Sequence, residues 1–337
     1  MARYEYLPVG FLDAKQALVG GVPVFGGGMV TQGKTYFVKP YSGSDGNTGT
    51  SMTNAFQTLA KALDVAVAGQ NDVVFLVAES NTAANTTDYQ SETLDWNKDM
   101  VHLIGVNSGP IMSHRSRIAL ISTYVTAGNL FTLSADACLI ANLSMFAGVA
   151  DAHPTGCLNV TGSRNVFKGC HIAGIGHASM DIAGAYSLKI DGAEELLFDR
   201  CYIGLNTVAA GSAANSEILI DGGAKNIEFY ESKVYRQIEH ATNHPLVKLA
   251  DATAIDEFLL FTRCGFISTS VNYGYTQGGV FKLAADLTQG LIILDNCYAI
   301  NDNASGAGKW DVDDRDKICV IASPTPEADS AGLIRVV

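Results

Sequence analysis

The chain has 337 residues, 47% of them hydrophobic and 17% charged, which is enough to bury a sizeable core and excludes a wholly disordered protein. Lysine and arginine number 22 against 34 acidic residues, so the net charge of −12 argues against nucleic acid as a partner. The seven cysteines include no CxxC pair, which argues against a zinc ribbon or a disulfide framework, and no cofactor or metal ion is expected.

Residues 1–35 are expected to form an extended N-terminal arm, because this segment is apolar and Gly-rich but has little periodicity. Residues 16–33 carry no charge, yet their six Gly and one Pro argue against a membrane-spanning helix. We expect neither a membrane anchor nor a secretory signal. Exposed apolar side chains are unfavourable in water. The arm is therefore either a tail without a partner or, as we predict, an anchor on another protein through Tyr4, Tyr6, Leu7, Phe11 and Phe25.

An amphipathic helix is predicted near residues 55–68, within the segment TNAFQTLAKALDVAVAG. The stripe that carries this prediction consists of Phe56, Leu59, Leu63 and Val67. Two apolar segments, 72–79 and 101–106, follow it and are predicted to be strands.

A repeat of 31 to 33 residues organises the chain from about residue 130 to 300. Five segments align without gaps and share one column of small residues: Cys170, Cys201, Ser232, Cys264 and Cys297. Three positions earlier the column is Phe167, Phe198, Phe229, Phe261 and Leu294. A second alternating segment in each unit contributes the column Leu133, Val160, Ile190, Ile220, Leu249 and Leu283.

This unit predicts an all-β fold, a right-handed parallel β-helix over residues 36–302 that is covered at its first coil by the helix. Helical repeats lack this alternation, and a propeller blade needs four strands in a longer unit. Five cysteines fall in inward columns, where we expect packing and not metal binding: Cys138, Cys170, Cys201, Cys264 and Cys297. Residues 303–337 break the repeat and are expected to be a linker with one last strand.

The entry segment, YFVKPYSGSDGNTGT followed by AFQTLAKALDVAVAGQNDVVFLVAES, resembles the start of right-handed parallel β-helix proteins of the pectate-lyase-like class. That class includes polysaccharide lyases, phage tailspikes and phage head proteins, and the resemblance covers about residues 36–300. It implies the fold, whereas many unrelated activities share this scaffold. The calcium-binding aspartates and catalytic arginine of a pectate lyase have no matching positions here, so no catalytic residue is carried over.

The fallback candidates for catalysis are Asp191 and Asp221, which follow equivalent strands and are expected about 5 Å apart, near the separation of a retaining glycosidase. The simpler interpretation is ordinary turn chemistry, since Gly follows each of them. Glu231 stands between Arg200 and Arg263 in one column, which indicates a surface ladder of ion pairs. His171 follows an inward Cys and is expected to be a solvated surface residue.

One outward column is apolar in five of its six members: Leu139, Val166, Leu197, Leu260 and Ile293, with Glu228 as the exception. A parallel sheet that is apolar on both faces is normally covered. Either loops or other subunits cover this face, and we predict a subunit interface in a homotrimer.

These features favour a phage virion structural protein without enzymatic activity, a capsid decoration protein or head fibre held on the major capsid protein or another virion protein by its arm. The main alternative is a tailspike-like polysaccharide depolymerase or lyase. A third possibility is a non-catalytic fibre that binds host glycan through outward Tyr202 and Tyr298.

Overall fold

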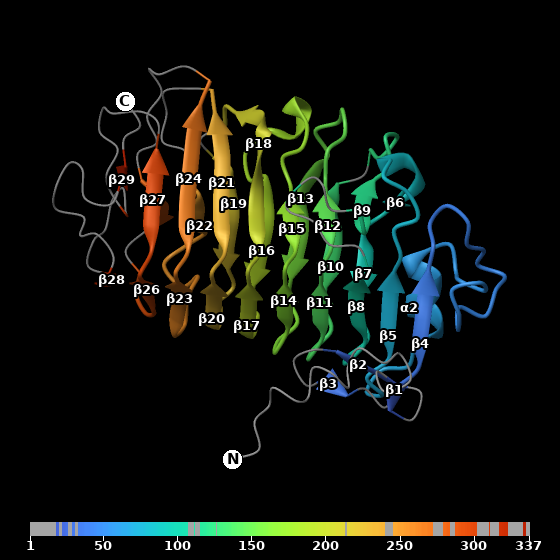
Figure 1. Cartoon of the computed structure of the whole chain (residues 1–337). Coiled ribbons are helices and arrows are strands. Elements are labelled where there is room, and N and C mark those ends of the chain that lie inside the picture. Colours follow the sequence, from blue (N-terminus) through green and yellow to red (C-terminus); the bar gives the residue numbers. More distant parts are fainter. Residues whose placement is uncertain are drawn as a thin grey trace, which may run out of the picture.

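A computed structural model of the chain shows a parallel β-solenoid in which three sheets run side by side along one axis (Figure 1). It describes residues 33–106, 111, 115–125, 127–212, 214–239, 245–271, 279–283, 287–301, 310 and 317–322, with short strands at 18–19, 22–25, 29–30 and 333–334. The predicted parallel β-helix is therefore confirmed.

A complete coil, such as β14 (Val166–Lys168), β15 (His171–Ala173) and β16 (Tyr186–Asp191), contributes one strand to each sheet, so strands about 30 residues apart become neighbours. The ten-stranded sheet contains β4 (Thr35–Val38), β5 (Val73–Leu76), β8 (His102–Gly105), β11 (Leu139–Ala141), β14 (Val166–Lys168), β17 (Glu194–Asp199), β20 (Lys225–Tyr230), β23 (Phe258–Thr262), β26 (Leu291–Asp295) and β28 (Ile318–Ile321). The nine-stranded sheet contains β6 (Thr87–Gln90), β9 (Arg117–Leu120), β12 (Ser144–Phe146), β15 (His171–Ala173), β18 (Tyr202–Ala210), β21 (Lys233–Ile238), β24 (Gly265–Ser270), β27 (Tyr298–Asn301) and β29 (Leu333–Ile334). The seven-stranded sheet contains β7 (Leu94–Trp96), β10 (Gly128–Leu133), β13 (Pro154–Val160), β16 (Tyr186–Asp191), β19 (Ser216–Asp221), β22 (Val247–Leu249) and β25 (Phe281–Leu283).

The bend from the ten-stranded to the nine-stranded sheet is made by one residue in the left-handed region of backbone conformation. These residues have φ between 48° and 60° and form one column: Asn142, Gly169, Arg200, Glu231, Arg263 and Asn296. The next residue is buried, and in five of these six coils, all but the one with Leu143, it is the small residue of the repeat.

The inward columns predicted from the repeat lie in register and form the core. The rings of Phe167, Phe198, Phe229 and Phe261 stack in sequence, with centroid separations of 4.6, 4.7 and 4.6 Å. The five cysteines assigned to inward positions are all buried free thiols. Side chains of one type thus stack one above the other in the middle coils, and mixed apolar side chains complete the core.

The predicted capping helix is shorter than expected: α2 spans Leu59–Val65. It begins after Thr58, whose hydroxyl accepts a hydrogen bond from Lys61 N at 3.1 Å. Phe56 precedes the helix and forms an isolated bridge with Val38. Leu59 and Leu63 are buried as predicted, but Val67 lies beyond the helix and is exposed. Two short 3₁₀ turns, Ala83–Asn85 and Ala178–Met180, complete the helical elements of the described residues.

Strands also occur in the two segments expected to lie outside the solenoid. In the arm, β1 (Leu18–Val19), β2 (Val22–Phe25) and β3 (Met29–Val30) form a three-stranded antiparallel sheet. In the C-terminal segment, β28 and β29 extend two of the three ladders of the solenoid. The proposed anchor residues Tyr4, Tyr6, Leu7 and Phe11 lie outside the described residues, and Phe25 is the last residue of β2.

Candidate functional site

The outward apolar column lies on the outer face of the ten-stranded sheet, with its members in direct register across consecutive strands. Glu228 is exposed. The apolar members of the column are half-buried in the single chain: Leu139, Val166, Leu197, Leu260 and Ile293. Neighbouring strands lie about 4.8 Å apart, so these six positions form a line roughly 24 Å long parallel to the solenoid axis. The sequence placed this column correctly, and what covers it in an assembly stays a prediction.

A charged ladder runs beside this column along the bend. Arg200 donates two hydrogen bonds to Asp199, at 2.8 and 2.9 Å, and they lower the pKa of the Asp199 carboxyl. Arg263 donates to Glu231 at 3.0 Å and to the hydroxyl of Tyr230 at 2.9 Å. Exposed pairs of this kind contribute little free energy. Their arrangement instead gives the apolar column a polar border, as in the rim of a protein interface.

The carboxylates of Asp191 and Asp221 are brought together as predicted, since the two residues are register partners at the ends of β16 and β19. Lys189 Nζ lies between them, 2.8 Å from Asp191 Oδ2 and 3.0 Å from Asp221 Oδ2. Burial lowers the pKa of Lys189, but its hydrogen bonds to both carboxylates leave that pKa raised. A retaining glycosidase needs one carboxyl to donate a proton. Here one ammonium group forms ion pairs with both carboxylates.

The prediction that His171 is a solvated surface residue is wrong, because its side chain is buried. Its Nε2 lies 2.8 Å from the Tyr235 hydroxyl and 3.1 Å from the Gly204 carbonyl oxygen. Tyr235 stands two coils further along and covers the histidine. Gly204, in the coil between them, lacks the side chain that would interfere: a Cβ there would lie 2.1 Å from Tyr235 O. Burial also raises the pKa of Tyr235.

A buried ion pair, Glu217 with Arg236, was missed by sequence reasoning. Arg236 Nε donates to Glu217 Oε1 at 2.9 Å, and the Ser187 hydroxyl donates to Glu217 Oε2 at 2.5 Å. The side chain of Arg236 is 0% exposed and that of Glu217 is 3% exposed. The signal in the sequence is that Glu217 and Arg236 are charged residues within strands rich in apolar residues. The sequence does not indicate that these two side chains meet across a corner between two sheets.

The tyrosines considered for glycan stacking have different surroundings. The ring of Tyr202 is half-buried and has Lys233 Nζ 5.3 Å from its centroid, so one face already has a cationic partner. Tyr298 is exposed at the C-terminal end of the nine-stranded sheet. The structure thus leaves Tyr298 as the more accessible ring of the two.

Within the described residues, no group of three or more His, Cys, Asp or Glu side chains is arranged to hold a metal ion. A hollow on the outer face of the first coils is lined by Tyr89, Arg117, Phe146 and Gly148, among others, and contains no carboxylate. A second hollow lies beside α2, where Asp64, Glu92 and Asp95 line it with Lys98. Among the residues that the structure describes, no helix is long and apolar enough to cross a bilayer.

No family model and no curated protein matches this chain. Among solved structures, pectate lyase Pel9A is similar with a TM-score of 0.52 at 13% identity, over 82% of this chain and 67% of that one. The Escherichia coli ybhc protein gives 0.46 at 11% identity, over 89% and 81%, and the Geobacillus virus E2 ORF18 protein gives 0.42 at 12%, over 82% and 59%. At 13% identity, the likeness to pectate lyase Pel9A shows a common fold and nothing more. The chain therefore has the parallel β-helix fold of the pectate-lyase-like class.

Proposed function

We propose that the protein is a structural component of a phage particle, a capsid decoration protein or head fibre that forms a homotrimer and is anchored through its N-terminal arm. The observation that carries this proposal is the apolar column on the outer face of the ten-stranded sheet. The function is adhesion and involves no catalytic step.

The column is suited to a symmetric side-by-side contact because it is straight and repeats with every coil. Three copies that face a common axis can each present Val166, Leu197 and Leu260 to their neighbours, and a closed ring of three leaves no apolar edge exposed. Each contact is small, but the contacts of all coils act together, as do the three anchors of a trimer on a particle.

The column predicts a specific pair of opposite effects. Leu197→Glu places a charge in the middle of the proposed interface and should convert the trimer to monomer. Glu228→Leu, in the next strand of the same column, removes the one charged member and should strengthen the association. Sedimentation velocity at micromolar concentration measures both. A monomeric parent protein, or the same oligomer in all three proteins, would contradict the proposal.

The attachment role is tested on particles. Electron microscopy of particles assembled with and without the protein should show added density on the capsid. A chain that lacks residues 2–16, and with them Tyr4, Tyr6, Leu7 and Phe11, should remain trimeric but no longer bind. Density on the tail, or binding that survives this deletion, would count against a capsid decoration protein held by its arm.

The alternative, a tailspike-like depolymerase or lyase, is favoured by the register pairing of Asp191 with Asp221. If this alternative is correct, the protein should cleave a host surface polysaccharide. That cleavage should be lost when both residues are changed to Asn. Asp251→Asn, at an exposed loop position, is the matched control. Cleavage by the parent and the control, but not by the double variant, would establish the enzyme and displace the purely structural role.

A further inference from the structure

The seven-stranded sheet begins at β7, and within the described part of the chain no further strand pairs with the outer edge of β7. Trp96 O accepts hydrogen bonds from Ser134 N and Ala135 N, at 3.2 and 3.1 Å, so Trp96 is bonded to the β10 side. Alternate residues of a parallel strand bond to opposite neighbours. The backbone N–H and C=O of Asp95 therefore point away from β10, and they form no backbone hydrogen bond with another described segment.

The first strand of the ten-stranded sheet is protected in a way that β7 is not. Phe37 N donates to Gly49 O and Phe56 N donates to Phe37 O, both at 2.8 Å, so the segment that precedes α2 pairs with the edge of β4. Among the described residues, no backbone segment pairs with β7 in this manner. A free strand edge is a template for an added strand.

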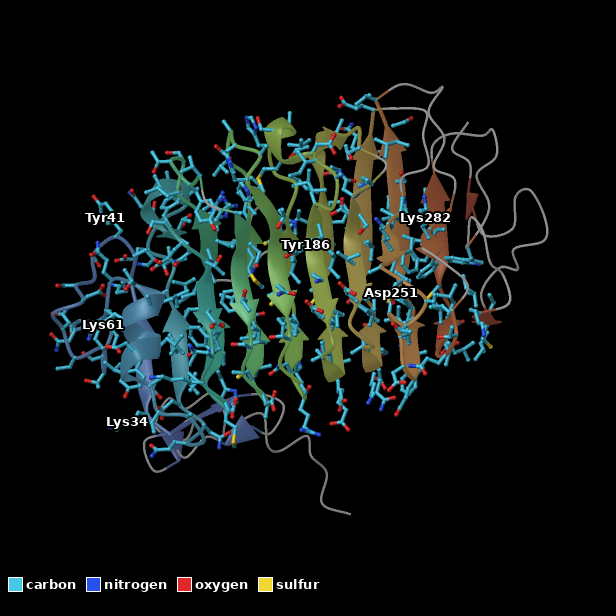
Figure 2. The ribbon with its side chains drawn as sticks, turned by 180° about the vertical axis from the view of Figure 1, so that it is seen from behind. Lys34, Tyr41, Lys61, Tyr186, Asp251 and Lys282 are labelled. Atoms are coloured by element: carbon cyan, nitrogen blue, oxygen red, sulfur yellow. The ribbon has the colours of Figure 1, made fainter. Side chains whose placement is uncertain are left out.

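A hollow with a volume of about 370 Å³ adjoins this edge and gives an added strand room. One wall is helix α2, through Ala60, Leu63 and Asp64, and the other is β7 with the residues that flank it. Ala60 and Asp95 are exposed, so the hollow opens to solvent. Figure 2 shows the helix, marked by Lys61, at this end of the solenoid.

The lining of the hollow is acidic. Asp64, Glu92 and Asp95 contribute three carboxylates, and Lys98 is the one cation that lines it with them. Lys98 Nζ donates to Asp64 O and Ala66 O, both at 2.8 Å, so its ammonium group is held against the end of α2. The hollow thus presents net negative charge beside the outward backbone groups of β7.

Charge and backbone together select the occupant. A second copy of this chain carries a net charge of −12 and would bring further negative charge to an acidic edge. A segment with lysine or arginine side chains instead meets complementary charge. An extended backbone also supplies the donors and acceptors that pair with Asp95, which a compact cation lacks.

We propose that the edge of β7 binds an extended, lysine- or arginine-bearing segment of another protein, which adds to the seven-stranded sheet as a further strand beside α2. The surface lies at the end of the solenoid and is distinct from the apolar column of the ten-stranded sheet. The inference therefore depends neither on the trimer nor on the phage role.

Synthetic peptides test the two parts of this proposal separately. A fluorescent peptide of four Lys-Val pairs should bind with a dissociation constant of roughly 10–100 μM in fluorescence anisotropy. The corresponding Glu-Val peptide should bind about tenfold more weakly, as should the Lys-Val peptide with N-methylated valine amides, which keeps its charge but cannot donate to the sheet. Absence of binding by the Lys-Val peptide, or equal binding by either comparison peptide, would overturn the proposal.

Two substitutions of one residue make the same distinction on the protein. Asp95→Asn removes only the charge and should weaken binding of the Lys-Val peptide about twofold. Asp95→Pro also removes the outward N–H, without the loss of a hydrogen bond to β10, and should weaken binding about tenfold. Asp251→Asn, at an exposed loop position, is the control and should bind as the parent does. Equal binding by Asp95→Asn and Asp95→Pro would show that the edge is not used, and if Asp95→Pro does not fold, the N-methylated peptide decides the same point.

The occupant is tested against self-association. Leu197→Glu, which removes the proposed trimer contact, should bind the Lys-Val peptide with the affinity of the parent. If a second copy occupies the edge of β7, the peptide should dissociate an oligomer of the parent in sedimentation velocity, and that result would refute a heterologous strand. A monomeric parent that binds the peptide supports the strand site and contradicts only the trimer, so the two failures are separate results.

Discussion

The position after the bend, where the column of Cys and Ser lies, requires a small side chain that can donate a hydrogen bond to the preceding coil. The thiols of Cys201, Cys264 and Cys297 each approach a backbone carbonyl of the preceding coil, at 3.3 to 3.6 Å. Ser232 makes the equivalent contact, donating to Phe198 O at 3.0 Å, and also accepts from Cys201 N at 3.0 Å. A compact side chain with a donor fits here. This explains why serine interrupts the cysteines without an unsatisfied buried hydroxyl.

The buried pair Glu217 and Arg236 leads to a prediction at the same scale. Glu217→Gln leaves the guanidinium buried without its countercharge and should reduce the free energy of unfolding by about 3–5 kcal/mol. Replacement of both residues, Glu217→Leu with Arg236→Met, removes both charges and should recover most of that loss. Urea denaturation of the parent, Glu217→Leu, Arg236→Met and the double variant measures the coupling, and Glu217→Gln is measured beside them.

The matched control for this cycle is Glu231→Gln, whose partner Arg263 is solvent-exposed. It should leave the free energy of unfolding nearly unchanged. Additive effects of the Glu217 and Arg236 substitutions would show that the pair is not energetically coupled and would contradict the prediction.

At the scale of the element, helix α2 is joined to the solenoid through a buried carboxyl. Asp88 Oδ2 accepts a hydrogen bond from Leu59 N, at the first residue of the helix, at 3.0 Å. Burial raises the pKa of Asp88 to about 7. Between about pH 4 and pH 7 the folded chain therefore keeps a proton that the unfolded chain releases, so this group makes stability fall as the pH rises through that window.

Asp88→Asn should remove this dependence. The variant is expected to gain roughly 1–4 kcal/mol relative to the parent between pH 5 and pH 8, because its amide is neutral at both values and can still accept the bond from Leu59 N. Denaturation curves at the two pH values provide the measurement. Asp64→Asn, at an exposed position of the same helix, should show no such gain, and equal pH profiles for parent and Asp88→Asn would refute the prediction.

The elements differ in how far the sequence alone predicted them. The inward columns follow from alternation and spacing, so the sequence alone predicts the buried positions of Cys170, Phe198 and their equivalents. The start of α2 depends on the extended backbone of Thr58, and its end precedes Val67, whose N–H donates to Asp72 at 2.9 Å. Contacts of this kind set the ends of the helix, so the apolar stripe alone predicts a helix that is too long.

Some features of the candidate site could also be predicted from the sequence, and others could not. Alternation places Leu197 and its column outward, and the repeat pairs Asp191 with Asp221. The burial of His171 depends instead on a tyrosine two coils away that lies over a glycine. A contact between residues 64 positions apart has no local pattern, and the same is true of the pairing of Glu217 with Arg236 across a corner.

At the scale of the whole molecule, two opposing forces act on the proposed trimer. Each copy carries a net charge of −12, so three copies side by side repel one another, while the apolar column draws them together. The charged ladder beside the column is paired within each chain, as in Arg200 with Asp199 and Arg263 with Glu231. It therefore offers few unpaired charges for bonds between copies.

This balance predicts that salt strengthens the assembly. Raising the ionic strength from about 0.05 M to about 0.5 M shortens the screening length several-fold and should lower the dissociation constant of the trimer, because repulsion is screened while apolar contact is not weakened. Glu228→Leu removes one negative charge from each copy at the interface, so its dissociation constant should depend less on salt. Sedimentation equilibrium across this range gives the slope for both proteins. A trimer that dissociates as salt rises would instead be held by ion pairs between copies, and the apolar column would lose its role as the contact surface.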